Sequence, residues 1–332
     1  MCLTLAWFVR GAWAAGENPT GRSDQPAAVL YAPDAYRVAM PALAELMQRV
    51  HTGDRPSMSA LCDFCFFFAA LFLLYRLTVD DLTPPAAGLL QRTAVVAIFL
   101  AFLQFPMAWV VPWQRPETAP TALYLAFALF CVSRTSRQGF WFVLLLAATV
   151  LQAFVRSDVP FVFGIALLLL SFGGDWLRPF GSRLSSALKA ALVAGAAAGV
   201  QMYLQCIRFP HLEYPPATAV IQLSNNLHPH NLWPFAVALL PFLLLGAFLM
   251  YRRPLLRSSM RPLLRLPDAL ALAVAGLYLP LWFTVGRSAE VRIFVPCLIT
   301  LCMVAARVFG GALATWCSGG EGGTSERTPR GN

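Results

Sequence analysis

Long apolar segments recur along this chain of 332 residues, and polar loops separate them. Hydrophobic residues make up 58% of the sequence and charged residues only 12%, and the mean hydropathy is +0.63. A transmembrane helix needs roughly 17–25 mostly apolar residues, and only helices or closed barrels satisfy the backbone in lipid. The apolar runs lack the two-residue alternation of a barrel strand. The sequence therefore predicts an all-α, polytopic transmembrane bundle.

The hydropathy pattern predicts nine transmembrane helices in a bundle at residues 59–316, or ten if residues 1–15 form a further helix, with no room for a separate soluble domain. Residues 1–15 are interpreted either as a truncated first transmembrane helix or as a signal-like segment. Residues 317–332 are rich in Gly, Ser and Thr, which predicts a disordered cytoplasmic tail. Two predicted spans, 119–133 and 159–173, are short, so we expect them to be tilted or partly sheltered. The nine spans are 59–76, 93–112, 119–133, 139–155, 159–173, 187–206, 233–250, 268–285 and 291–312.

The distribution of positive charge predicts the topology. The net charge is +9, and all but Lys189 of the 25 basic residues are arginines. The excess lies in alternate loops, so the positive-inside rule explains it and no nucleic-acid partner is predicted. We expect a bacterial inner-membrane protein whose Arg-rich loops, above all 251–267, are cytoplasmic. The other loops are then extracytoplasmic: 16–58, 113–118, 156–158, 208–232 and 286–290.

The first extracytoplasmic segment, 16–58, contains an amphipathic pattern typical of a helix lying in the membrane interface. Its apolar stripe includes Leu43 and Met47, and Asp34 and Arg37 lie on the opposite stripe. Asp34 is a candidate general base or metal ligand that faces a membrane-level cavity. The alternatives are a solvated surface helix and an N-terminal helix cap at Asp34.

Two further clusters place ionisable residues on the same side. Arg156 and Asp158 occupy a short turn, where they form either an exposed ion pair worth little or a site in which Arg156 binds an anionic head group. Arg287, Glu290 and Arg292 lie at the start of the last span. Two guanidiniums for one carboxylate leave one positive charge, which suits a phosphate or carboxylate ligand. The alternative is that Arg292 only reaches the lipid head groups.

The segment 208–232 holds three of the four histidines, and we expect its polar residues to line an acceptor site. His-x-Glu and His-x-His sequences can bind zinc, but here they lie in Pro-rich stretches without a helical scaffold. No cofactor is therefore predicted, although a divalent metal stays open. The candidate acceptor residues are His211, Glu213, His228 and His230.

Three motifs carry a resemblance to a known family: D-x-Y-R-V-x-x-P-x-L from Asp34, R-x-D at 156–158 and G-R-x-x-E-x-R-x-F-x-P at 286–296. They resemble a group of bacterial membrane proteins whose layout is similar to the C-type superfamily of membrane glycosyltransferases. The resemblance implies a polyprenyl-phosphate-linked sugar as donor. It also implies that Asp34 is the acidic catalytic residue and that Arg287 or Arg292 holds the donor phosphate.

Three interpretations of function follow. The first is a glycosyltransferase-like protein, in which Asp34 deprotonates an acceptor hydroxyl and Arg287 with Arg292 stabilises the leaving phosphate. The second is a transporter or lipid flippase, with Arg156, Glu290 and Arg292 along its route. The third is a non-catalytic assembly subunit. The ionisable residues lie together on the extracytoplasmic side of the membrane, and this favours the glycosyltransferase-like interpretation.

The topology is tested by single-cysteine labelling of intact cells in a background without the eight native cysteines. We expect Ser258→Cys, within the Arg-rich loop, to resist an impermeant thiol reagent, and Ser224→Cys, within 208–232, to react. Labelling of Ser258→Cys from outside would overturn the topology and, with it, the predicted site.

Overall fold

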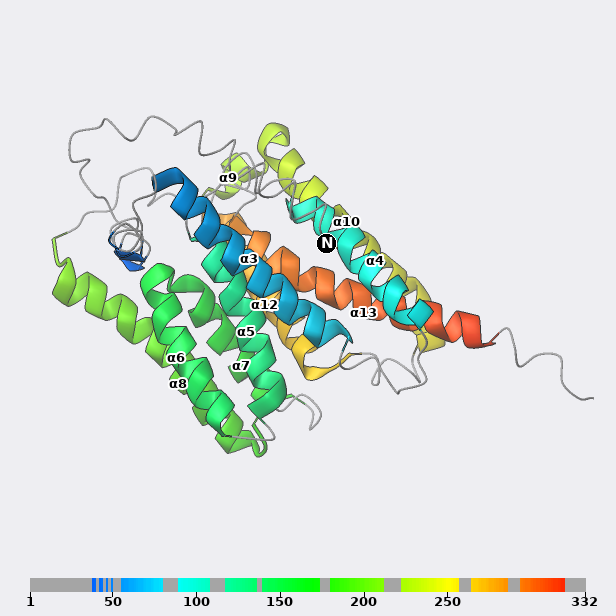
Figure 1. Cartoon of the computed structure of the whole chain (residues 1–332), viewed down its shortest axis with the longest axis horizontal. Helices are drawn as coiled ribbons and strands as arrows, with labels where there is room; N and C mark the ends of the chain where they lie inside the picture. The colour runs from blue at the N-terminus through cyan, green and yellow to red at the C-terminus, as the bar shows by residue number, and fades with distance from the viewer. Residues whose placement is uncertain are drawn as a thin grey trace, which may run out of the picture.

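The computed structural model describes residues 38–39, 42–43, 46, 49, 55–79, 89–107, 117–135, 139–173, 180–211, 222–256, 264–285 and 293–319. Within these residues the chain forms ten α-helices and one π-helical turn, and it forms no strand. The predicted all-α bundle is confirmed. Figure 1 shows most of the long helices running side by side, with α13 crossing the middle of the bundle.

Each of the nine predicted spans coincides with one long helix. The largest differences are at α4, which ends at Met107 rather than 112, at α10, which ends at Leu256 rather than 250, and at α13, which begins at Val295 rather than 291 and ends at Gly319 rather than 312. The helices are α3 (Arg55–Val79), α4 (Leu89–Met107), α5 (Thr118–Thr135), α6 (Phe140–Val155), α7 (Asp158–Ser171), α8 (Arg183–Tyr203), η4 (Leu204–Arg208), α9 (Leu223–Asn226), α10 (Pro229–Leu256), α12 (Leu266–Val285) and α13 (Val295–Gly319).

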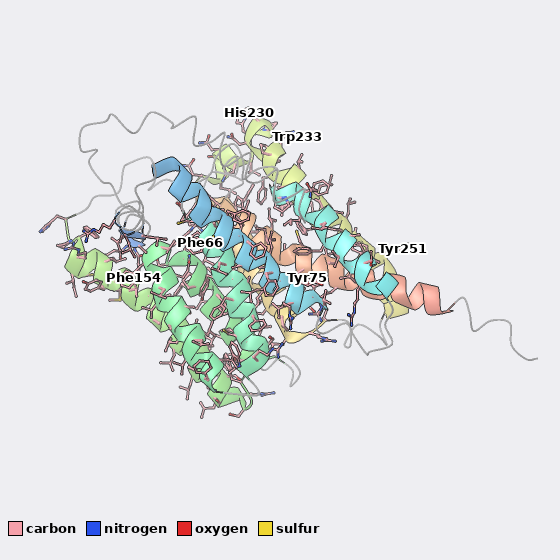
Figure 2. All side chains as sticks on the ribbon, in the orientation of Figure 1. Phe66, Tyr75, Phe154, His230, Trp233 and Tyr251 are labelled. Carbon is pink, nitrogen blue, oxygen red and sulfur yellow. The ribbon has the colours of Figure 1, made fainter. Side chains whose placement is uncertain are left out.

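Four helical segments of the described chain are long and apolar enough to cross a membrane: Cys62–Val79, Arg183–Arg208, Pro229–Ala247 and Leu266–Val285. Shorter apolar helices accompany them. Large apolar side chains on the outside of the bundle, such as Leu188, Leu192 and Leu243, are exposed. Figure 2 shows side chains projecting outward from these helices, with Trp233 and His230 together at the start of α10. The chain is therefore a membrane protein with transmembrane helices.

The centre of the bundle is built around α5 and α13. Every residue of α13 from Val295 to Val308 is buried, and most of α5 is buried as well. α13 packs against α3, α4, α5 and α12, and α5 packs against α3 and α6. The short span predicted at 119–133 is thus sheltered by protein, as expected from its length.

One ion pair lies inside this core, toward the end of the bundle where α12 begins. Arg307 of α13 donates from Nη1 to Asp268 Oδ1 of α12 at 3.1 Å, and both side chains are buried. Oδ2 of Asp268 accepts the backbone N–H of Arg265 at 2.9 Å. Asp268 therefore both caps the first turn of α12 and neutralises a buried guanidinium.

A glycine permits a close approach of the backbones of α7 and α8. A Cβ added at Gly164 would lie 2.5 Å from the backbone nitrogen of Ala194, whereas a Cβ at Gly195 would meet nothing within 4 Å. Real Cβ atoms cannot approach a backbone so closely, so α7 and α8 would have to separate. Gly164 therefore permits the tight packing of this helix pair.

We expect Gly164→Ala to lower the free energy of unfolding by about 1–3 kcal/mol, as overpacking of a close-packed interface does. Thermal unfolding of the detergent-solubilised protein measures this change. The matched control is Gly195→Ala, which should leave the melting temperature unchanged or raise it slightly, because alanine favours the helix. Equal melting temperatures for the two variants would contradict the close approach.

Candidate functional site

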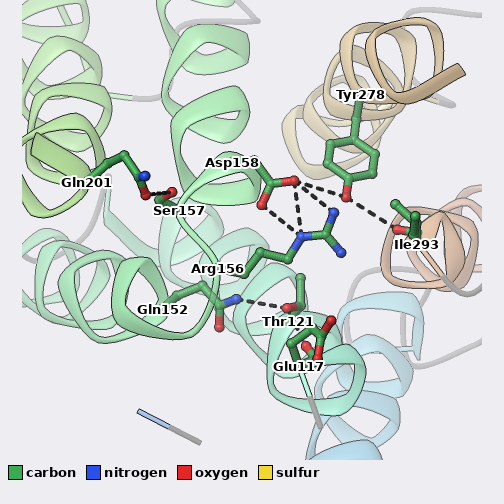
Figure 3. A network of polar contacts seen from close by, with 9 residues as sticks. All are labelled: Glu117, Thr121, Gln152, Arg156, Ser157, Asp158, Gln201, Tyr278 and Ile293. Carbon is green, nitrogen blue, oxygen red and sulfur yellow. Dashed lines mark hydrogen bonds and ion pairs between the residues drawn. The ribbon is translucent and has the colours of Figure 1, made fainter. Parts of the chain in front are cut away.

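The connection between α6 and α7 carries a buried ion pair. Arg156 ends α6 in an extended conformation, with its N–H bonded to the carbonyl of Gln152 at 2.6 Å. This sharp exit places Asp158 in the first turn of α7, where the helix dipole favours a carboxylate. Nε of Arg156 lies 2.8 Å from Oδ1 of Asp158, and Nη2 lies 2.9 Å from Oδ2 (Figure 3). The guanidinium therefore contacts the carboxylate through a bidentate fork.

Two aromatic side chains of α12 complete the surroundings of Arg156. The Cζ atom of Arg156 lies 5.0 Å from the ring centroid of Trp282 and 5.8 Å from that of Tyr278. The Tyr278 hydroxyl lies 3.3 Å both from Oδ2 of Asp158 and from the carbonyl oxygen of Ile293, just before α13. One cluster thus joins the α6–α7 connection to α12 and to the start of α13.

Two more carboxylates belong to the same end of the bundle. Glu117, just before α5, and Asp63, near the start of α3, are each 4% exposed, and their charges act on each other. Glu117 also acts on Arg156, and the two side chains lie close together in Figure 3. The Thr121 hydroxyl donates to the Glu117 carbonyl and accepts from Nε2 of Gln152 at 2.8 Å, which holds α5 against α6.

The electrostatic surroundings keep Arg156 charged. Burial alone lowers the pKa of this guanidinium. The carboxylate of Asp158 raises this pKa through its charge and its hydrogen bonds. Tyr278 and Glu117 raise it further. The net result is a pKa raised above the ordinary arginine value. The cluster therefore contains a permanent cation, 8% exposed, inside a largely apolar bundle.

The segment before α10 packs onto the same end of α12. The Asn226 side chain donates to the carbonyl of Phe283 at 2.5 Å, and the Gln222 N–H donates to the carbonyl of Thr284 at 2.8 Å. These bonds satisfy carbonyls of the last turn of α12, which have no partners within the helix. Part of the predicted acceptor segment 208–232 is thereby attached one residue from Trp282.

Part of the first predicted extracytoplasmic segment, 16–58, packs near the α6–α7 end of the bundle. Ala42 donates its N–H to the carbonyl of Val38 at 3.3 Å, as in a helical turn. Val38 packs against Leu204, whose neighbours include Phe154 of α6. Close by, Ser157 donates to Oε1 of Gln201 on α8 at 2.5 Å. Leu43 is half-buried and Leu46 is 57% exposed, so this part of the predicted amphipathic helix has a protected and an open side.

The predicted site residues fall into three groups. Arg156 and Asp158 form the predicted pair, but they are mostly buried, so the alternative of an exposed ion pair is wrong. His211, His228 and His230 are exposed, and within the described ranges no three His, Cys, Asp or Glu side chains form a group that could hold a metal ion. The remaining predicted residues lie outside the described residues: Asp34, Arg37, Glu213, Arg287, Glu290, Arg292 and Met47.

Sequence reasoning missed three members of the cluster: Glu117, Tyr278 and Trp282. Glu117 lies in the short loop 113–118, which was predicted to be extracytoplasmic. Its carboxylate on that side could have been recognised in the sequence as a candidate member of the site. Tyr278 and Trp282 are one helical turn apart near the end of an apolar helix. Aromatic residues at that position are equally typical of a lipid interface, so the pattern alone does not distinguish the two roles.

No family model, curated protein or solved structure matches this chain. The assignment of a role to the cluster therefore depends on its own geometry and chemistry.

We expect Asp158→Asn to destabilise the protein by on the order of 1–3 kcal/mol, because it leaves the Arg156 guanidinium buried without its anion. This range is below that of a fully buried pair because the Asp158 side chain is 23% exposed. Unfolding in detergent of Asp158→Asn, Arg156→Gln and the double variant forms the test. The double variant should be more stable than the sum of the two single changes predicts, and strict additivity would show that the pair is not coupled.

Proposed function

We propose that this protein is a multi-pass protein of the bacterial inner membrane, a glycosyltransferase-like enzyme that uses a lipid-phosphate sugar donor at its extracytoplasmic face. The observation that carries the proposal is the gathering of Arg156, Asp158, Glu117, Tyr278 and Trp282 at one end of the bundle. The charges are buried among helices, and the positive-inside rule assigns this end to the extracytoplasmic side. Buried ionisable groups within a membrane bundle indicate a functional site.

Chain connectivity brings the predicted catalytic segments to the same end. Asp34 precedes Val38 by four residues, and Val38 packs against Leu204, which Phe154 near the end of α6 also contacts. The segment that contains Arg287, Glu290 and Arg292 links the end of α12 to Ile293, whose carbonyl belongs to the cluster. Both segments are therefore attached within a few residues of the Arg156 cluster.

In the proposed reaction, the Asp34 carboxylate accepts the proton of an acceptor hydroxyl. The acceptor oxygen then attacks the anomeric carbon, and the bond from that carbon to the phosphate oxygen breaks. The lipid phosphate leaves with the bonding electron pair, and Arg287 and Arg292 stabilise its charge. Arg156 is assigned a different task, because its fork is already bound to Asp158. Arg37 and the residues His211, Glu213, His228 and His230 are assigned to binding of donor and acceptor.

The proposal is tested with protein purified into nanodiscs that contain undecaprenyl phosphate sugars, by mass-spectrometric detection of released undecaprenyl phosphate. We expect Asp34→Asn to reduce turnover by roughly 10²–10⁴-fold, the usual contribution of a general base. The matched control is Asp24→Asn, the same chemical change in the same segment, which should keep full activity. Arg292→Lys, which keeps the charge and loses the fork, should impair turnover, and Arg292→Ala should impair it at least as much.

The outcomes separate the alternatives. Folded Arg292 variants with full activity would show that this side chain only reaches the lipid head groups. Wild-type protein that releases no lipid phosphate but moves the lipid between leaflets would favour the flippase. Wild-type protein that does neither, with or without added divalent metal, would favour a non-catalytic assembly subunit.

A further inference from the structure

Trp282 presents a hydrogen-bond donor that the fold does not use. Its indole nitrogen, Nε1, is buried and makes no hydrogen bond in the described part of the chain. Buried donors are nearly always satisfied in native proteins, so an isolated one needs an explanation. A tryptophan whose only role was packing could be replaced by phenylalanine, which carries no such donor.

The ring of Trp282 is held in place from several sides. The Arg156 guanidinium lies 5.0 Å from its centroid, and the Tyr278 ring lies 6.2 Å away at an interplanar angle of 46°. Arg156 is fixed in turn by Asp158, and the Asn226 side chain bonds to the carbonyl of the next residue, Phe283. The direction of the indole N–H is thus set by its neighbours before any ligand binds.

We infer that the indole N–H of Trp282 donates a hydrogen bond to an acceptor oxygen in the head group of the lipid-phosphate ligand. This inference rests on the proposed function and deepens it. An indole N–H is a donor only, so its partner is an oxygen of a phosphate or a sugar hydroxyl rather than a donor group. Arg156 is then a positioning residue: it orients the Trp282 ring and does not itself bind the phosphate.

The neighbouring chemistry suits a polar head group. The carboxyl groups of Glu117 and Asp63 lie at the same end of the bundle, and carboxyl oxygens can accept hydrogen bonds from the hydroxyls of a sugar. Trp282 lies three residues before the end of α12 at Val285, and the chain then continues into the segment with Arg287 and Arg292. A head group at Trp282 would therefore be close along the chain to the arginines assigned to its phosphate.

The test uses Trp282→Phe, which replaces the indole with a smaller phenyl ring and so keeps an aromatic ring beside Arg156 without the N–H. The control is Trp233→Phe, because Trp233 is 69% exposed on α10, far along the chain from the cluster (Figure 2). Both variants and the wild type are placed in nanodiscs. Native mass spectrometry then measures their affinities for undecaprenol, undecaprenyl phosphate and undecaprenyl phosphate-glucose.

We expect Trp282→Phe to weaken binding of undecaprenyl phosphate, of its glucose derivative, or of both by roughly tenfold, and to leave undecaprenol binding unchanged. Equal losses for the two phosphorylated lipids assign the phosphate oxygen as the acceptor. A loss confined to the glucose derivative assigns a sugar oxygen. Trp233→Phe should bind all three lipids as the wild type does.

Stability without ligand provides the second measurement. Trp282→Phe removes a buried unsatisfied donor but also part of a packed ring beside Arg156, so we expect its melting temperature to stay close to that of the wild type. A markedly lower melting temperature combined with unchanged lipid selectivity would show that the ring only packs and would overturn the inference. Wild-type affinity of Trp282→Phe for all three lipids would also overturn it while leaving the proposed function standing. Absence of selective binding by the wild type would overturn the proposed function and the inference together.

Discussion

The buried ion pair between Arg156 and Asp158 is the interaction on which the described cluster depends. A guanidinium within an apolar bundle is costly unless it is paired and hydrogen-bonded, and the fork to Asp158 meets both conditions. Because the pair spans the turn between α6 and α7, it also sets how these helices meet. Tyr278 extends the same contact to α12 and to Ile293, so four segments share one electrostatic centre.

α12 is consequently tied near both of its ends. At one end Asp268 pairs with Arg307 of α13, and toward the other end Tyr278 contacts the carbonyl of Ile293 just before α13. The two helices are antiparallel, and these contacts fix their register as well as their distance. A rigid pair at the centre of the bundle holds the Trp282 ring steadily beside Arg156, which a preorganised binding site requires.

The positions of the helices could be predicted from the sequence because membrane helices need long apolar stretches, and polar loops separate these stretches along the chain. Arg156 and Asp158 could be predicted as partners because the turn leaves them two residues apart. Tyr278 and Trp282 could not, because their roles depend on which face of α12 meets the α6–α7 connection. The same limit applies to Arg307 and Asp268, which lie 39 residues apart in the sequence and pair only through the packing of α12 on α13.

Two buried charge clusters lie toward opposite ends of α12. Asp268 caps α12 and neutralises Arg307, whose Nε is nevertheless buried without a hydrogen bond in the described part of the chain. At the opposite end the described residues contribute one guanidinium and three carboxylates, from Asp158, Glu117 and Asp63, together with an indole N–H that has no acceptor. Replacement of buried ion pairs by apolar residues often leaves stability unchanged or raises it, so stability alone does not explain this collection. The proposed head-group ligand would use both the carboxyl oxygens and the indole donor.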